Sequence, residues 1–166
     1  MPGLSLVATF TANTIDGNIN YQNGSDFDLA GATIHGSVTI TGSNQESDLE
    51  PSICGSRING SVTIRIVTTV PLLIGDPGEP SIANGAGDCP GNIIGGSVTF
   101  ANDTTPIIME ANTVAGSVSI NNSAIEFVGN SAASLQCSNG GSLASSSDDT
   151  NHGNAIRGAN TCVNAP

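Results

Sequence analysis

The sequence contains no lysine and no tryptophan, and only 10% of its residues are charged. The 166 residues include three arginines and 14 aspartates and glutamates, which gives a formal net charge of -11. So few basic residues cannot form the positive patches that bind nucleic-acid backbones and anionic membrane surfaces. Aromatic residues make up 3% of the chain, which leaves little material for stacking platforms. We therefore expect no nucleic-acid partner and no small-molecule ligand.

Long apolar runs are also missing, because no segment reaches the roughly 20 apolar residues that span a bilayer. We therefore expect no membrane insertion. Residues 1–12 lack the basic start and the apolar run of a signal peptide. This is expected either of a cytosolic protein or of a mature form with an added methionine. The even number of cysteines in an Asn/Ser/Thr-rich chain favours the mature form, secreted or at the cell surface.

A short repeat recurs along the chain. GSVTI occurs at 36–40 and 60–64, GSVTF at 96–100, GSVSI at 116–120, and the variant GNINY at 17–21. An aliphatic residue lies two positions before each of these glycines, and two degenerate copies follow near residues 132–137 and 156–162. The glycines of the five good copies are separated by 19, 24, 36 and 20 residues. Seven units therefore run from about residue 13 to residue 162, with insertions in the second and third intervals.

Alternation of apolar and polar residues on both sides of each glycine predicts two short strands joined by a corner. The glycine is expected to supply the backbone freedom that this corner needs. A third alternating segment, such as 27–29, 107–109 or 125–127, completes the unit. The sequence therefore predicts an all-β fold: one parallel β-solenoid of about seven coils, three-sided, and right-handed by the usual crossover preference.

Equivalent residues of successive coils are expected to stack in three inward-facing columns. The first column is Ile15, Ile34, Ile58, Ile94, Val114 and Ile156. The second is Ile19, Val38, Val62, Val98, Val118 and Leu135, and the third is Tyr21, Ile40, Ile64, Phe100 and Ile120.

The columns also predict how the cysteines pair. Cys137 and Cys162 fall in the third column of the last two coils, where stacked residues lie at a separation that suits a disulfide. Cys54 and Cys89 both precede a good copy of the repeat by a few residues. We predict the pairs Cys54–Cys89 and Cys137–Cys162, each stabilising by roughly 3–4 kcal/mol. Four free buried thiols are the alternative, and the absence of CxxC spacing argues against zinc.

Segments 43–56 and 75–92 are rich in proline, glycine and acidic residues and predict loops on one corner of the solenoid. Segment 138–153 predicts a further polar loop. Residues 1–12 form a separate element before the solenoid domain of residues 13–166. Its apolar alternation over Leu4, Leu6, Ala8 and Phe10 predicts either an N-terminal cap or a strand donated to the last coil of a neighbouring molecule.

One predicted face of the solenoid is uncharged and flat. Outward positions on the strand after the corner carry short hydroxyl side chains: Ser37, Thr39, Ser61, Thr63, Ser97, Thr99, Ser117 and Ser119. These hydroxyls either pair with one another along the sheet or form an array similar to that of ice-binding solenoids.

Candidate catalytic and metal-binding residues are few. His35 and His152 lie in different units, and the three arginines are scattered. Asp26, Asp28 and the acidic stretch 148–151 lack the spacing of a calcium motif. No catalytic or nucleotide-binding motif occurs. We expect neither an enzyme nor a cofactor nor a metal site.

The recurring Ile/Val-x-Gly-Ser-Val-x-Ile unit, with Leu135-Gln136-Cys137-Ser138 and a terminal cysteine, resembles secreted actinobacterial-type β-helix proteins of unknown function. The pattern is also similar to bactofilins, which are short polymer-forming β-helices, although the cysteines and long insertions depart from them. The resemblance implies the fold, is compatible with self-assembly, and carries over no activity.

We therefore expect a non-enzymatic extracellular structural protein whose partner is itself, joined end to end into a fibre or surface layer by strand addition. A binding module that uses the flat Ser/Thr face against ice or another regular surface is the alternative. A carbohydrate-binding β-helix is a further one.

Overall fold

The protein is a parallel β-solenoid built from three sheets. Its computed structural model describes residues 7–24, 26–42, 51–68, 71–81, 87–144 and 153–162. Sheet A contains, in order, β1 (Val7–Thr11), β4 (Asp26–Ala30), β7 (Ser52–Cys54), β10 (Leu72–Ile74), β15 (Ile107–Glu110), β18 (Ala124–Val128) and β21 (Ser142–Leu143). Sheet B contains β2 (Thr14–Ile15), β5 (Thr33–Ile34), β8 (Arg57–Ile58), β13 (Ile93–Ile94), β16 (Thr113–Val114), β19 (Ser131–Ala132) and β22 (Ala155–Ile156). Sheet C contains β3 (Ile19–Gln22), β6 (Val38–Thr41), β9 (Val62–Arg65), β14 (Val98–Ala101), β17 (Ser117–Asn121) and β20 (Ser134–Ser138).

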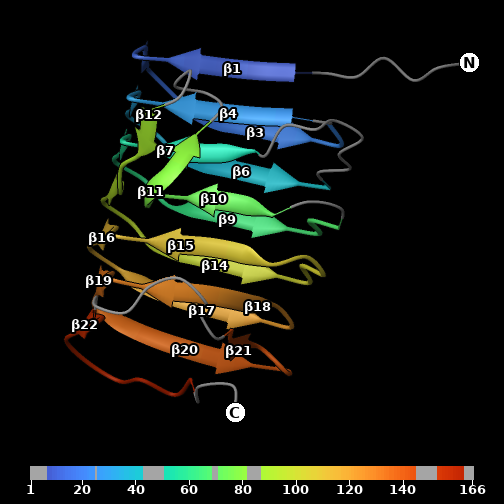
Figure 1. Ribbon diagram of the computed structural model, residues 1–166, viewed down its shortest axis with the longest axis vertical. Helices are drawn as coiled ribbons and strands as arrows, with labels where there is room; N and C mark the ends of the chain where they lie inside the picture. The colour runs from blue at the N-terminus through green and yellow to red at the C-terminus, as the bar shows by residue number, and fades with distance from the viewer. Residues whose placement is uncertain are drawn as a thin grey trace, which may run out of the picture.

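Each turn of the chain supplies one strand to sheet A, then one to sheet B, then one to sheet C. Six turns contribute all three strands, and β21 and β22 begin a partial seventh. The strands of sheets A and C run in opposite directions on the two broad sides, and the short strands of sheet B join them along one edge (Figure 1). Seen along the solenoid axis from the N-terminal end, the chain turns clockwise as it moves away from the viewer. The solenoid is therefore right-handed (Figure 1).

The three predicted columns form the core. Residues of the second column pair in register from Ile19 through to Leu135, and those of the third from Tyr21 to Ile120. The first column differs at one point, because Ala132 of β19 occupies the sixth turn and pairs with Ile156. The sequence interpretation missed Ala132 because the sixth unit lacks the glycine that marks the other copies of the repeat. A fourth inward set comes from sheet A, where residues such as Phe27 and Met109 are fully buried.

Four of the five repeat glycines, Gly36, Gly60, Gly96 and Gly116, owe their place to close stacking and not to the expected backbone freedom, whereas Gly17 has a φ of 146° and open space around it. Gly60 stacks on Gly36 of the preceding turn and donates its N–H to the Gly36 carbonyl oxygen at 2.9 Å. A Cβ on Gly60 would lie 2.6 Å from that oxygen, and one on Gly116 would lie 2.8 Å from the Gly96 oxygen. Successive turns at this corner would be forced apart by any side chain.

Left-handed backbone is concentrated at the other two corners. Between sheets A and B the residues with positive φ are mostly glycines. Between sheets C and A they are Asn23 (φ 53), Gly42 (φ 68), Ile66 (φ 59), Asn102 (φ 61), Asn122 (φ 48), Asn139 (φ 50) and Gly140 (φ 85). Asparagine and glycine tolerate this conformation, whereas a β-branched side chain is strained in it. Ile66 is therefore the exception in its column, and its side chain is 47% exposed.

We predict that Ile66→Asn raises the free energy of unfolding by about 1 kcal/mol, because it removes a β-branched residue from left-handed backbone. Little burial is lost, since the isoleucine is exposed. Chemical denaturation of the two proteins measures the change. The reciprocal variant Asn102→Ile at the same corner serves as the matched control and should destabilise. A destabilised Ile66→Asn protein would contradict this explanation.

The insertions lie on two different corners, which corrects the prediction that they share one. The insertion that includes residues 43–50 separates β6 of sheet C from β7 of sheet A. The insertion between β10 and β13 separates sheet A from sheet B instead. Its described part is an antiparallel hairpin of β11 (Asp76–Ser81) and β12 (Gly87–Cys89), not a loop. Residues 52–54, also predicted as loop, form β7 within the stack.

The hairpin lies over sheet A near β7 (Figure 1). Leu73 faces away from the core, yet it is only 4% exposed, and it packs with Cys54, Cys89 and Ile108 in a second small apolar cluster. Both predicted disulfides are confirmed. Cys54 is bonded to Cys89 with Cα atoms 4.7 Å apart, and Cys137 to Cys162 with Cα atoms 4.8 Å apart. Disulfides of this kind are typical of an oxidising environment.

Candidate assembly surfaces

The two ends of the solenoid are built differently. At the N-terminal end, β1, β2 and β3 form a complete turn, and each is the terminal strand of its sheet. At the other end, β21 and β22 have two residues each, and Asn160 forms only an isolated bridge to Leu135. The described N-terminal turn therefore offers the longer set of strand edges.

The described part of the segment predicted as a cap or donor strand belongs to the stack, as its first strand. Val7–Thr11 pairs in parallel with Asp26–Ala30 as the sheet A strand of the first turn, so it is not outside the repeat. Ala8 and Phe10 hold the register positions of Phe27 and Leu29. Leu4 and Leu6 lie outside the described residues. The first turn is thus available as an edge for stacking, with β1 already part of it.

The direction of the backbone groups in β3 follows from its pairing. The N–H groups of Ile19 and Asn23 donate to Ser37 and Thr41 of the second turn, both at 2.9 Å. Because alternate residues of a parallel strand bond to the same neighbour, the N–H groups of Asn20 and Gln22 point away from the second turn. They lie on the edge that a further strand would contact.

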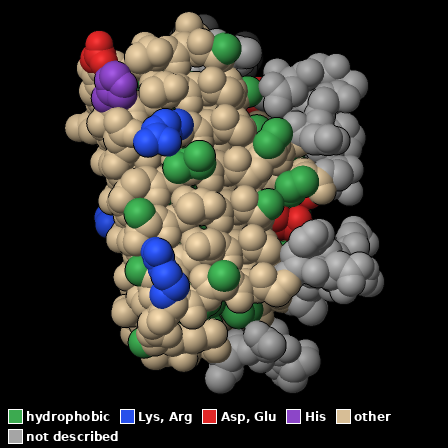
Figure 2. All heavy atoms as spheres, turned by 90° about the vertical axis from the view of Figure 1, so that its left-hand side faces the viewer, with side chains coloured by type: hydrophobic (Ala, Val, Ile, Leu, Met, Phe, Trp, Pro, Cys, Tyr) green, Lys and Arg blue, Asp and Glu red, His purple; other side chains and the backbone are tan. Residues whose placement is uncertain are grey.

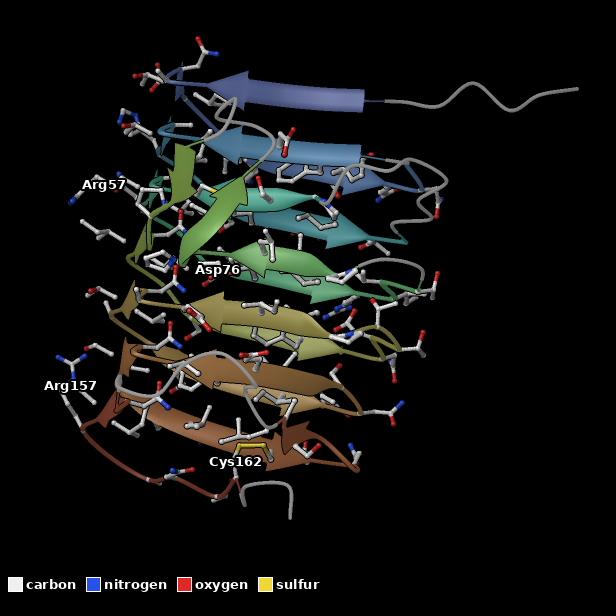
Figure 3. The ribbon with its side chains drawn as sticks, viewed as in Figure 1. Arg57, Asp76, Arg157 and Cys162 are labelled. Carbon is white, nitrogen blue, oxygen red and sulfur yellow. A yellow bond between two sulfur atoms is a disulfide. The ribbon has the colours of Figure 1, made fainter. Side chains whose placement is uncertain are left out.

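A short C-terminal stretch lies along the outer edge of β20. Leu135 N–H donates to the Ala159 carbonyl at 2.9 Å, and Thr161 N–H donates to the Leu135 carbonyl at 2.9 Å. Cys137 N–H donates to Thr161 Oγ1 at 3.1 Å. The Cys137–Cys162 disulfide fixes this stretch at the C-terminal end of the solenoid, as Figure 3 shows at the labelled Cys162.

The serines of the predicted flat face serve the solenoid itself. The N–H of four of the five serines donates to a side-chain oxygen of the turn above: Ser37 to Asn18 at 2.8 Å, Ser61 to Ser37 at 3.1 Å, Ser97 to Ser61 at 3.1 Å, and Ser117 to Ser97 at 3.2 Å. Ser134 Oγ donates to Ser117 Oγ at 2.8 Å. The serines thus form a hydrogen-bond ladder along the corner between sheets B and C, in which a backbone N–H is the donor at most steps and one step, Ser134 to Ser117, joins two hydroxyls.

The other half of that face is a separate column on sheet C. Its members pair in register, half-buried through most of the column and exposed at its ends: Asn20, Thr39, Thr63, Thr99, Ser119 and Gln136. Arg65 lies in the adjacent column and is exposed. No strand of sheet B or sheet C contains an aspartate or glutamate. The surface that remains for contacts is therefore an acid-free face of short polar side chains.

Charge is divided between the sides of the molecule. Arg57, Arg65 and Arg157 lie on or beside strands of sheets B and C, whereas the acidic residues within strands belong to sheet A and the hairpin. Figure 2 shows the sheet B side, where basic side chains lie on the surface, and Figure 3 shows Arg57 and Arg157 pointing outward there. Within the described strands, basic and acidic residues are thus distributed unevenly around the solenoid axis.

A buried ladder of asparagine side chains was missed in the sequence. The backbone N–H groups of Ser56, Asn92 and Asn112 donate to the side chains of Asn92, Asn112 and Asn130 at 2.8, 2.8 and 2.9 Å. Asn130 N–H continues the ladder to Asn154 at 2.9 Å. The signal was present, because a polar residue precedes six of the seven inward residues of sheet B by two positions, the exception being Ala32 before Ile34. Asparagine had been interpreted only as a turn former.

The amide groups of this ladder also bond to the backbone of other turns. Asn112 Nδ2 donates to the Ile74 carbonyl at 2.7 Å, to the Glu110 carbonyl at 2.8 Å and to Asn130 Oδ1 at 3.0 Å. Asn92 Nδ2 donates to Asn112 Oδ1 at 2.9 Å. Each amide therefore ties three turns together at the corner between sheets A and B.

Asp103 holds the corner between sheets C and A. Its carboxylate accepts hydrogen bonds from Val67 N–H and Ser123 Oγ, both at 3.0 Å, and its own N–H donates to Ser123 Oγ at 3.1 Å. Burial raises the pKa of the Asp103 carboxyl above its ordinary 3.8, and the hydrogen bonds from Val67 and Ser123 oppose this shift. These contacts are local to the corner, so the carboxyl acts as part of the scaffold.

The remaining chemically interesting residues are dispersed. His35 faces out, as predicted, and its Nδ1 lies 2.6 Å from Asp16 Oδ1 on the surface. Asp28 is buried and accepts a hydrogen bond from Ser52 Oγ at 3.0 Å. His152 lies outside the described residues. Within the described ranges, no group of three His, Cys, Asp or Glu side chains is arranged to hold a metal ion.

Comparison with protein-family models, with curated proteins and with solved structures gave no match. In the part of the chain that the structure describes, no helix has the length and apolar character required to cross a membrane.

Proposed function

We propose that this chain is a secreted, non-enzymatic structural protein whose molecules stack end to end. The observation that carries the proposal is the N-terminal turn, which is complete and terminal in all three sheets. Exposed strand edges are templates for pairing with another chain. A second copy of this solenoid supplies strands of the same spacing and direction.

The columns favour a head-to-tail joint. The second column begins with Ile19 and ends with Leu135, and the third begins with Tyr21 and reaches Cys137 in β20. Because β21 and β22 hold the seventh turn in sheets A and B, the first turn of one molecule stacks beneath that turn of another, with β1 under β21 and β2 under β22. Ile15 then lies beneath Ile156, which continues the first column across the joint. Such a contact is heterologous and does not close, so it generates a fibre. The sides formed by sheets B and C, whose strands contain no acidic residue, then favour lateral packing of fibres into a layer.

We predict that Asn20→Pro lowers the assembled fraction at least tenfold, because proline removes an outward N–H and is an edge-blocking residue. Asn20→Ser, which keeps the N–H, is the control. Light scattering and electron microscopy, under oxidising and reducing conditions, measure assembly. Six turns and a partial seventh should give an axial repeat of about 34 Å. Monodisperse monomers of the parent protein under both conditions would refute the proposal.

A second candidate function is binding to a regular surface such as ice through the polar column on sheet C. Its in-register threonines and the absence of acidic residues from this sheet favour it. Thr63→Arg at the middle of the column should then abolish thermal hysteresis, while Thr113→Arg on sheet B should not. Absence of hysteresis in the parent protein would end this candidate.

A further inference from the structure

The two ends of the solenoid carry side chains of opposite charge. Asp16 is the only charged side chain in residues 1–24, which include the first turn. Arg157 is the only charged side chain in the described part of the last turn, residues 142–144 and 153–162. The N-terminal turn therefore presents one carboxylate, and the described part of the C-terminal turn presents one guanidinium.

Both residues hold the same position on sheet B. Asp16 follows Ile15 of β2, and Arg157 follows Ile156 of β22, and these two strands are the first and the last of the seven in that sheet. A residue that directly follows an inward residue of a strand points outward, and Figure 3 shows Arg157 doing so. Within one molecule the two positions are six strand spacings apart, about 29 Å. Asp16 and Arg157 of the same chain therefore cannot meet.

The same column already contains a charged contact between adjacent strands. His35 lies one strand spacing from Asp16, and its Nδ1 is 2.6 Å from Asp16 Oδ1. Side chains at this position on adjacent strands therefore come within hydrogen-bond distance. The Asp16 side chain is still 86% exposed, so its carboxylate has room for a second partner on the side away from the second turn.

Arg157 is available for such a contact. Its residue is exposed, and among the described residues its guanidinium has no carboxylate partner. It donates instead to the Ala115 carbonyl at 3.3 Å. Hydrogen bonds in which both groups are charged are shorter and stronger than those to a neutral carbonyl. A carboxylate placed next to Arg157 would therefore displace the Ala115 carbonyl as its acceptor.

We propose that Arg157 of one molecule binds Asp16 of the next across the head-to-tail joint, and that this pair gives the fibre its direction. The inference rests on the proposed function. With Ile15 beneath Ile156, Asp16 lies one strand spacing from Arg157, which is the spacing that separates Asp16 from His35.

The pair disfavours the other ways of joining two ends. A joint between two N-terminal turns has Asp16 on both sides, and a joint between two C-terminal turns has Arg157 on both sides. Like charges repel, so the head-to-tail joint is the one that brings these opposite charges together. Molecules with a net charge of -11 also repel one another as a whole, which makes a local attraction at the joint more important.

The pair also specifies the register of the joint. β2 and β22 have two residues each, so hydrogen bonds between them hold the register weakly. A slip of two residues preserves the alternation of inward and outward side chains. It would, however, move Asp16 from Arg157 to Ala155 or Ala159, and the ion pair would be lost.

The test reverses each charge separately, in Asp16→Arg and in Arg157→Asp. Each variant alone has like charges at every head-to-tail joint. We expect the concentration needed for half-maximal assembly in low salt to rise about tenfold, because an attraction is replaced by a repulsion. An equimolar mixture of the two variants should assemble at the parental concentration, since every joint of an alternating fibre pairs opposite charges. Sedimentation measures the assembled fraction, and electron microscopy identifies fibres.

Two controls isolate the pair from net charge and from folding. Arg57→Asp makes the same change of charge in the third turn of sheet B, away from the joint, and should assemble at the parental concentration. Raising the salt from 10 mM to 1 M shortens the Debye length from about 30 Å to about 3 Å and should bring both reversed variants within about twofold of the parent. A misfolded variant would recover neither in salt nor in the mixture.

Two results would overturn the pair and leave end-to-end assembly standing: single variants that assemble at the parental concentration, or a mixture that assembles no better than its components. Discrete dimers in place of fibres from the mixture would assign the pair to a lateral contact and would also overturn its place in the joint. A parent protein that forms no fibres in either low or high salt would overturn the proposed function, and the pair with it.

Discussion

Replacing Asn112 by alanine should lower the free energy of unfolding by about 3 kcal/mol or more, the sum of several unsatisfied buried groups. The side chain is 1% exposed, and it satisfies the N–H of Asn92 together with the carbonyls of Ile74 and Glu110. Alanine would leave these groups without that partner at a corner too tightly stacked for water. Urea denaturation followed by circular dichroism measures the loss.

Two variants separate hydrogen bonding from the volume that is lost. Asn112→Ser should destabilise less, because Ser56 in the same column accepts from Ala32 N–H at 3.1 Å and donates to the Cys54 carbonyl at 3.1 Å. Asn13→Ala, at the exposed start of the column, should have little effect. If the alanine variant at 112 were as stable as the parent, the ladder would not be a source of stability.

Removing the buried disulfide with Cys54→Ala and Cys89→Ala should lower stability by about 4 kcal/mol, since the bond closes a loop with a sequence separation of 35 residues. The change also loosens the hairpin over Leu73. Because the bond joins β7 to the insertion in the middle of the stack, the loss should be global. Thermal unfolding should show a single transition at a lower temperature.

The matched control is Cys137→Ala with Cys162→Ala. That bond has a similar separation of 25 residues but lies at the end of the stack, where turns unravel locally without unfolding their neighbours. We expect the control to change the global transition little. If removal of either disulfide lowered the free energy of unfolding equally, the central turns would not contribute more to global stability than the end of the stack.

The repeating part of the fold could be predicted from the sequence because it rests on two signals that repeat at every turn. Alternation places residues such as Val62 inward, and a glycine marks each close approach between turns. The cysteine pairs follow from the same alignment. Parallel stacking in register is dictated by the need to bury each apolar face against its neighbour.

Other parts of the fold could not be predicted, because there the alternation of apolar and polar residues or the repeat glycine is missing, or a residue has two explanations. β7 lies in a stretch rich in proline and acid, and Ser52 at an outward position is buried beside Asp28, so local composition misled the prediction. The serine hydroxyls were counted as an outward face, although their position at a corner lets them bond to the next turn. Which strands end the stack depends on pairing over long range, which the degenerate copy of the repeat near residues 156–162 does not reveal.

The hairpin between β10 and β13 shows that length along the chain and length along the solenoid axis are independent in this protein. Ile58 and Ile94 are 36 residues apart, yet they are adjacent rungs, just as Ile94 and Val114 are at a separation of 20. Extra chain enters and leaves at a corner without changing the pitch. That corner is consequently a graft point, at which a foreign peptide would be displayed once per molecule along any polymer the protein forms.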